Sequence, residues 1–226
     1  MDMKREIVIA AYDKPLDWLN NIHDVKKTIY RKGNVIPLVD GEILIEPNLG
    51  RCVHSFFHHI YVNYDNLSDI TFFVQDYPFD HWEDLIEIIN GDIDKEPTLN
   101  IGGYNGHHFN TIKIPSDKGG IMHPMYPSQH HINGKIIACY SNGLPHDPNP
   151  NINVDSYWDL LFDSPKPNMY EFIPGGHFSI TKEHARLRSL ALYKKVVDLL
   201  IEDITAPWMI ERLECYIFNP NYKTKL

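Results

Sequence analysis

The 226-residue chain has few cysteines, no long apolar run and fewer basic than acidic residues. Its three cysteines, Cys52, Cys139 and Cys215, are far apart and odd in number. This favours free thiols in a reducing compartment and argues against a disulfide framework or a structural zinc site. The apolar run near the N-terminus covers only about six residues, too few for a signal peptide or a membrane span. We therefore expect a cytoplasmic protein with no membrane span.

The charge balance limits the partners. The chain has 21 Lys and Arg against 30 Asp and Glu, a formal net charge of −9. This charge repels a phosphate backbone over most of the surface, so nucleic acid is not an expected partner. A small anionic ligand is still allowed, because one cation or a bound metal reverses the sign inside a cleft.

Residues that can form a core are abundant. Of all residues, 43% are hydrophobic and 12% are aromatic, which is the composition of a globular protein. The length fits a single domain over residues 1–226. Residues 97–175 are rich in Gly, Pro, Asn and His and have little periodicity. They predict long loops or a small lobe, and loops of this length usually carry function. The polar ending NPNYKTKL can continue as a linker into another domain. The alternative that the chain is the N-terminal part of a longer protein therefore stays open.

The first predicted elements are a strand and a helix. The segment EIVIAAY, residues 6–12, is apolar on both faces, which is typical of a central strand covered by helices. After it, Asp13 is placed to cap a helix that begins near Pro15. The apolar stretch NVIPLV, residues 34–39, predicts a second strand.

The alternation of predicted strands and helices continues after residue 50. Apolar residues between 52 and 64 recur at helical spacing and form one face: Cys52, Val53, Phe56, Phe57, Ile60, Tyr61 and Tyr64. The segment DITFFVQD, residues 69–76, predicts another strand, and HWEDLIEIINGD predicts a helix that stops near Gly91. Strand and helix in alternation indicate an α/β fold with a mixed, mostly parallel central sheet flanked by helices.

The C-terminal part predicts a glycine turn, a short strand and two helices. The first helix begins near Lys182, and its apolar side is expected to be Leu187, Leu190, Ala191, the Lys194 stem and Val197. The second has Pro207 in its first turn, where proline is favoured.

The acid Asp76 is the leading candidate for a functional site. In parallel sheets ligands bind beyond the carboxyl ends of the strands, where Tyr12, Asp13 and residues 75–81 are expected. A carboxylate at that edge suits Mg²⁺ or Mn²⁺, which takes one or two carboxylates and substrate phosphate oxygens. Equally, Asp76 and Asp80 can be turn formers around Pro78, with His81 capping the next helix.

Histidines provide two further candidates. In GGHF, residues 175–178, the glycines permit close approach of a ligand and His177 can bind a metal or a sugar, although a plain strand-entry turn explains them as well. His54 and His58 are one helical turn apart, a spacing that can hold a transition metal. A solvated helix face is the favoured interpretation of this pair.

Charged residues in apolar surroundings complete the candidates. Glu211 and Arg212 interrupt an apolar helix, either as a structural ion pair or as part of a cleft. Arg51 follows Gly50 at the start of a predicted helix, which suits a phosphate or carboxylate partner.

Five blocks in order, IVIAAYD, NLGR, ITFFVQDYPFDH, GGHFSIT and WMIERL, resemble those of small GT-A-type glycosyltransferases. The resemblance is closest to the glycosyltransferase domains encoded by large chlorella viruses and to related fungal proteins. It implies a single GT-A-like (Rossmann-like) domain, a UDP-sugar donor, and Mn²⁺ or Mg²⁺ that bridges a carboxylate and the diphosphate. Residues 97–175 would then form the acceptor side.

The resemblance also implies site residues. The donor-binding set would be Ala10, Ala11, Tyr12, Asp13, Arg51, Gln75, Asp76, Tyr77, Gly175 and Gly176. Asp76 would be the main metal carboxylate, with His177 in place of the second acid, because Asp76-Tyr77-Pro78 stands where such enzymes usually have Asp-x-Asp. Glu211 would be the catalytic base, followed by Asp80. Tyr77, Trp82 and Tyr104 are candidates for stacking on sugar or base rings, although core packing explains many aromatics of this kind.

The acceptor implied by the resemblance is a glycan or glycoprotein, in a virus a capsid glycan made in the host cell cytoplasm. Two other functions stay open. One is a zinc-dependent hydrolase that uses the histidine-rich loops with His54 and His58. The other is a carbohydrate-binding module without catalysis, which needs exposed aromatic side chains but neither nucleotide nor metal.

Overall fold

The computed structural model describes residues 3–34, 40–80, 82–91, 154–167 and 176–220. In the remaining parts it describes the strands β5 (Ile112–Pro115), β6 (Gly120–Met122), β7 (Gln129–Ile132), β8 (Lys135–Ser141), β9 (Leu144–Pro145) and β10 (Met169–Phe172). The expected sites at His81 and Gly175, the stacking candidate Tyr104 and most of the predicted strand at 34–39 lie outside the described residues.

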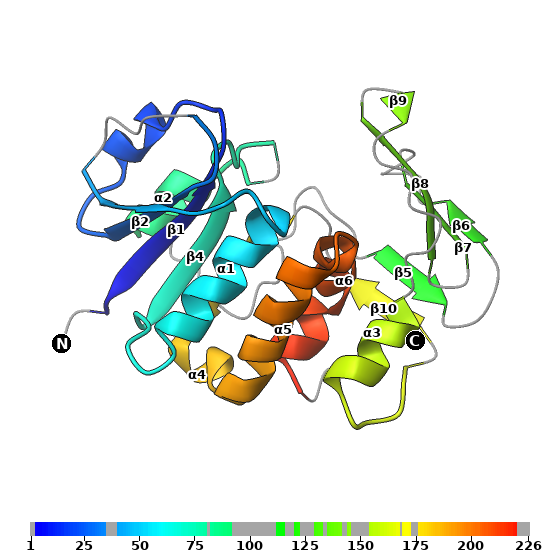
Figure 1. Ribbon diagram of the computed structural model, residues 1–226. Helices are drawn as coiled ribbons and strands as arrows, with labels where there is room; N and C mark the ends of the chain where they lie inside the picture. The colour runs from blue at the N-terminus through cyan, green and yellow to red at the C-terminus, as the bar shows by residue number, and fades with distance from the viewer. Residues whose placement is uncertain are drawn as a thin grey trace.

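The central sheet has five strands, β1 (Arg5–Ala11), β2 (Lys26–Arg31), β3 (Glu42–Ile45), β4 (Ile70–Gln75) and β11 (Phe178–Thr181). Their order is β11-β4-β1-β2-β3, in which β11 is antiparallel to β4 and the other neighbours are parallel. The sheet is thus mixed and mostly parallel, with helices on both faces (Figure 1). The predicted α/β, Rossmann-like fold is confirmed.

Successive side chains of a strand point to opposite faces of the sheet, so the core has two parts, one on each face. On β1, Val8 and Ala10 face a core formed with α1 (Arg51–Val62), α3 (Val154–Leu161), α5 (Leu190–Glu202) and α6 (Ala206–Phe218). Ile7 and Ile9 face the other core, with the 3-10 helix η1 (Asp17–Asn21) and α2 (Leu85–Asn90). Both faces of β1 are therefore apolar, as predicted for a central strand.

Two predicted elements of the N-terminal part need correction. No helix begins near Pro15 under an Asp13 cap; the helix there is the short η1, which begins at Asp17 after Leu16. The sequence KKTIYR was not recognised as a strand and forms β2. Its two lysines obscure the pattern, because only the residues after Lys27 are well buried.

The helices of the C-terminal part also differ from prediction. The helix expected from Lys182 is two helices, α4 (Lys182–Ala185) and α5, since the Thr181 and Ser189 side chains each cap a new N-terminus. The buried side of α5 is Tyr193, Val196, Val197 and Leu200. Leu187 and Leu190, which were predicted to share the apolar side of the helix, are both exposed, and Leu187 lies before α5 begins. Pro207 lies in the first turn of α6, as predicted.

The region expected to be loop-rich contains antiparallel strands. β6, β7, β8 and β9 follow one another in a four-stranded sheet, and β5 pairs with β10. Figure 1 shows β10 beside the helices α3 and α6, and the four-stranded sheet farther out, away from the central sheet. Among the described residues, no helix has the length and hydropathy that a membrane crossing requires.

Candidate functional site

The strand order creates a switch point between β1 and β4. The chain passes from β1 to β2 and β3 on one side, and then returns to place β4 on the other side of β1. In open α/β sheets, ligands bind outside the carboxyl ends of the strands at such a point. The residues that follow β1 and β4 are Tyr12 and Asp76, so the expected site lies at this edge.

Asp76 holds the segment that follows β1. Its Oδ2 accepts hydrogen bonds from the backbone N–H groups of Tyr12 at 3.0 Å, Asp13 at 3.0 Å and Lys14 at 2.9 Å. The Asp76 carbonyl oxygen in turn accepts from the Trp18 indole N–H at 2.9 Å. The two loops of the switch point are therefore joined through one carboxylate, whose residue is 9% exposed.

Aromatic side chains surround this junction. Tyr12 is 52% exposed and Tyr77 is 49% exposed, so both can offer a ring face to a ligand. Phe79 lies between Tyr77 and Trp18, at centroid distances of 5.4 and 5.3 Å. Trp82, by contrast, is 2% exposed and packs on Phe72. The prediction that Trp82 stacks on a ligand is therefore wrong.

Lys32 and Gly33, which the sequence analysis missed, shape the loop after β2. The Lys32 ammonium donates to the carbonyl oxygens of Leu49, at 2.6 Å, and of Arg51. It lies 3.5 Å from Glu46 Oε2, and burial lowers its pKa. A Cβ on Gly33 would lie 2.0 Å from the Tyr12 carbonyl oxygen, so only glycine allows these loops to touch. Neither role has a sequence signal beyond a Lys-Gly pair after a strand.

Gln75 connects the end of β4 to two other segments. Its Nε2 donates to Cys52 Sγ at 3.4 Å, and its backbone N–H donates to His177 Nε2 at 3.4 Å. His177 is 1% exposed and follows Gly176, whose φ of 63° is left-handed. The structure therefore joins His177 to the end of β4 through Gln75, the residue before Asp76.

Cys52 is a partly buried thiol in the same cluster. Burial raises its pKa to about 11; the charge of Lys32 lowers it, and those of Glu211 and Glu214 raise it further. The thiol is therefore protonated at neutral pH and acts as a hydrogen-bonding core residue, not a nucleophile.

Trp208 of α6, one turn before Glu211, contacts the start of α1. The Arg51 guanidinium lies over the Trp208 ring, 4.4 Å from its centroid, one turn of α6 before Glu211. Glu211 Oε2 is 3.2 Å from Arg212 Nη1, and the Glu211 side chain is 15% exposed. Because α1 begins at the same edge of the sheet where β3 ends, Glu211 and Arg51 belong to the switch-point side of the molecule.

Behind Glu211, the acid Glu214 is buried. It is 1% exposed, and neither of its carboxyl oxygens has a hydrogen-bond partner in the described part of the chain. Burial raises its pKa well above the ordinary value, and the charge of Glu211 adds to the effect. Burial therefore disfavours the ionised form of the Glu214 carboxyl group, a feature with no signal in the sequence.

The histidines of α1 do not form a solvated face, and that interpretation is wrong. His54 and His59 are buried, since His54 Nδ1 lies 2.7 Å from Glu46 Oε1 and His59 Nε2 lies 3.5 Å from Glu6 Oε1. The His54 and His58 rings stack at 5.6 Å with an interplanar angle of 13°. Stacked rings do not converge on one metal ion.

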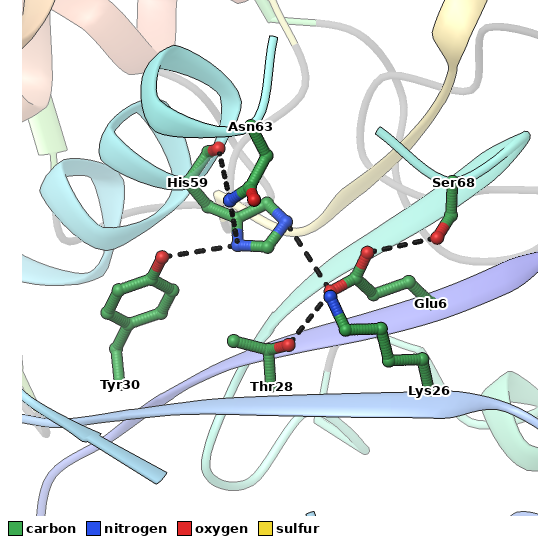
Figure 2. A network of polar contacts seen from close by, with 7 residues as sticks. All are labelled: Glu6, Lys26, Thr28, Tyr30, His59, Asn63 and Ser68. Atoms are coloured by element: carbon green, nitrogen blue, oxygen red, sulfur yellow. Dashed lines mark hydrogen bonds and ion pairs between the residues drawn. The ribbon is translucent and has the colours of Figure 1, made fainter. Parts of the chain in front are cut away.

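The network around Glu6 ties α1 to the sheet (Figure 2). The Glu6 carboxylate accepts from Thr28 Oγ1 at 2.8 Å and Ser68 Oγ at 3.0 Å, and lies 2.9 Å from the Lys26 ammonium. His59 Nδ1 is hydrogen bonded to the Tyr30 hydroxyl at 3.2 Å. Glu6 lies near the start of β1, so this network supports the helix from the edge opposite the site.

Four other predicted site residues lie at the end of β1 or in the segments that follow β1 and β4. Ala10 and Ala11 end β1 and are buried, so their small side chains leave room but offer only backbone groups. Asp13 and Asp80 are exposed. No group of three His, Cys, Asp or Glu side chains suited to a metal occurs among the described residues.

A metal that relies on substrate oxygens fits this edge better than a protein cage. Mg²⁺ and Mn²⁺ in nucleotide sites use one or two carboxylates and take their other ligands from phosphates and water. Asp76 can supply one carboxylate, with Oδ2 engaged by the three amides. His177 Nε2 already accepts the Gln75 N–H, so its predicted metal role requires a change of partner.

The chain was compared with protein families, curated proteins and solved structures. A family model described as "Protein of unknown function (DUF3431)" matches residues 7–224. Neither the curated proteins nor the solved structures gave a match.

Proposed function

We propose that this chain, which belongs to the DUF3431 family of proteins of unknown function, is a metal-dependent glycosyltransferase that uses a UDP-sugar donor. The observation that carries the proposal is the meeting of Asp76 with residues 12–14 at the switch point between β1 and β4. Nucleotides bind at such points in open α/β sheets. An acid directly after β4 is where a cation bound to the diphosphate would need a carboxylate.

The surroundings of Asp76 support a nucleotide-sugar. Tyr12 and Tyr77 expose aromatic rings beside it, and rings of this kind stack on a base or a sugar. Ala10 and Ala11 end β1 with small side chains that pack in the core, so β1 offers a ligand only its backbone groups. Arg51 lies at the start of α1, where its guanidinium can pair with a phosphate oxygen.

Glycosyl transfer requires two groups from the protein, a positive group at the leaving diphosphate and a base for the acceptor hydroxyl. As the bond from the sugar to the diphosphate breaks, negative charge grows on the leaving oxygen, and a fixed positive group must meet it. Arg51 is the described cation that we assign to this task. A metal ion, when bound to the diphosphate and Asp76, supplies further charge stabilisation as a Lewis acid.

The acceptor hydroxyl must also lose a proton. We assign this to Glu211, which is partly exposed and held by Arg212 at 3.2 Å. Asp80, exposed in the turn after β4, is the second candidate. The acceptor class that we propose is a glycan or glycoprotein.

Release of UDP from a panel of UDP-sugars, with Mn²⁺ and a mixture of sugar acceptors, tests the activity. We expect turnover with at least one donor, and a loss of roughly 10²–10⁴-fold in kcat with little change in donor KM for Glu211→Gln. Glutamine keeps the hydrogen bond to Arg212 but cannot take the proton. Glu202→Gln, an exposed acid at the end of α5, is the control and should retain full activity.

Absence of turnover with every UDP-sugar would count against the enzyme and favour a carbohydrate-binding module built on Tyr12 and Tyr77. Full activity of Glu211→Gln would move the base to Asp80. For the zinc hydrolase, the stacked His54 and His58 provide no converging ligands, so no observation on the described residues favours it.

A further inference from the structure

Three consecutive backbone amides converge on one point at the switch-point edge. The N–H groups of Tyr12, Asp13 and Lys14 all donate to Asp76 Oδ2, at 2.9 to 3.0 Å. Successive amides that point into one concavity form a nest, an arrangement that binds anions and recurs in phosphate sites. The nest in this chain already contains an anion, the carboxylate of Asp76.

The position of this nest is unusual for a purely structural contact. It lies where β1 and β4 end on either side of the switch point, the place where this fold binds ligands. The exposed Tyr12 and Tyr77 border it, and the Lys14 side chain beside it is exposed. A phosphate oxygen that entered the crevice would meet the three amides with the same geometry that Asp76 Oδ2 now has.

The backbone at Asp76 is held independently of its carboxylate. The Trp18 indole N–H donates to the Asp76 carbonyl oxygen at 2.9 Å, and the preceding Gln75 is fixed by His177 and Cys52. The side chain can therefore rotate away from the nest while the end of β4 keeps its place. Rotation alone would leave three amides without an acceptor, so an incoming anion has to replace the carboxylate.

We propose that the amides of residues 12–14 form an oxyanion site for a phosphate group, and that Asp76 fills this site until the ligand takes its place. The identity of the ligand as a donor diphosphate rests on the proposed function; the oxyanion site itself does not. The exchange explains why a cation would be required. Two anions at the nest repel each other, and a divalent ion held by the Asp76 carboxylate would supply the positive charge that offsets this repulsion.

Inorganic pyrophosphate is the probe, because it has the phosphate chemistry and no nucleoside. We would titrate it by calorimetry into the full chain without metal, for the wild type and for Asp76→Ala, Asp76→Asn and Asp80→Ala. We expect Asp76→Ala to bind pyrophosphate about tenfold or more tightly than the wild type, because the nest is vacant and a negative charge is gone. Asp76→Asn, which keeps a neutral acceptor in the nest, should show a smaller gain.

Asp80→Ala is the matched control. It removes the same charge four residues away, from an exposed side chain that is not part of the nest. Equal gains in Asp76→Ala and Asp80→Ala would reduce the effect to net charge and overturn the proposal. So would an affinity of Asp76→Ala no better than that of the wild type, which is the result expected if Asp76 is a permanent clamp.

A second measurement covers the case in which Asp76→Ala does not fold. In ¹⁵N spectra of Asp76→Asn, pyrophosphate should shift the amide signals of residues 12–14 more than any others; shifts elsewhere only would reject the site. The outcomes are separable from those of the proposed function. Pyrophosphate binding at the nest without any preference for UDP would keep the oxyanion site and reject the nucleotide-sugar donor.

Discussion

At the scale of single residues, the switch-point edge contains strained and close-packed positions. Gly50 and Arg51 have φ of 57° and 53°, in the left-handed region. A Cβ on Gly50 would lie 2.7 Å from the Leu200 carbonyl oxygen, so glycine is required there. Arg51 has no such freedom, and a non-glycine residue in this region is strained. The Arg51 guanidinium lies over the ring of Trp208 of α6.

The strain at Arg51 can be separated from its contact with Trp208. Arg51→Ala and Arg51→Gly both remove the guanidinium, but only glycine relieves the backbone. We expect Arg51→Gly to be more stable than Arg51→Ala by about 1 kcal/mol in the free energy of unfolding, measured with urea.

Arg186, at a helical φ of −79°, is the control for this comparison. There the order should be reversed, with alanine the more stable of the two, because glycine loses more backbone entropy. If glycine is no better than alanine at position 51, the strain of the left-handed conformation is no larger than the backbone entropy that glycine loses, and our account of that position is wrong.

The residues of the site were partly predictable. Asp76, Tyr12 and Gln75 follow from a simple rule, because each lies at or just after the carboxyl end of a strand. The partners of Asp76 could not be predicted, since three amides meet its carboxylate only when the loop after β1 is folded. Lys32 and Glu214 were missed because their burial depends on distant segments.

At the scale of elements, α1 is held on the sheet by apolar and by ionic contacts. Its apolar side packs on Phe73 and Phe178, while His54 and His59 reach the buried acids Glu46 and Glu6. Periodicity correctly predicted the helix and its apolar face. It could not show that the acids would lie opposite the histidines, because Glu6 is on β1 and Glu46 follows β3.

The Glu6 network predicts a pH dependence of stability. Burial by itself raises the pKa of Glu6, but hydrogen bonds and charge from His59, Lys26 and Thr28 outweigh it and lower the pKa from 4.5 to about 2. A depressed carboxylate pKa stabilises the fold above the unfolded value, and this stability is lost as the pH falls from 4.5 towards 2. The full contribution is about 3 kcal/mol.

Glu6→Gln tests this assignment. We expect its free energy of unfolding at pH 7 to be lower by about 1.5–3 kcal/mol, with a flatter decline than the wild type between pH 5 and pH 2. Glu42→Gln, an exposed acid on β3, should keep the wild-type profile. A wild-type profile in Glu6→Gln would mean that the buried network does not control acid stability.

At the scale of the whole molecule, the arrangement of the elements is what supports a function. The order β11-β4-β1-β2-β3 puts the switch point between two strands whose ends carry Tyr12 and Asp76. The alternation of strands and helices was sufficient to predict the α/β class and a mostly parallel sheet. The short strand β11 was predicted, but its antiparallel place beside β4 was not, because neighbours in a sheet are chosen by tertiary packing. The strand β2 was missed because its two lysines obscure the pattern.

The most direct test of the central claim is a calorimetric titration of UDP into the full chain with and without Mn²⁺, with GDP and CMP as controls. The account predicts that UDP binds tightly only when the metal is present, and that GDP and CMP bind at least about tenfold more weakly. Failure of all three nucleotides to bind, with or without Mn²⁺, would contradict the assignment of this chain as a nucleotide-sugar glycosyltransferase.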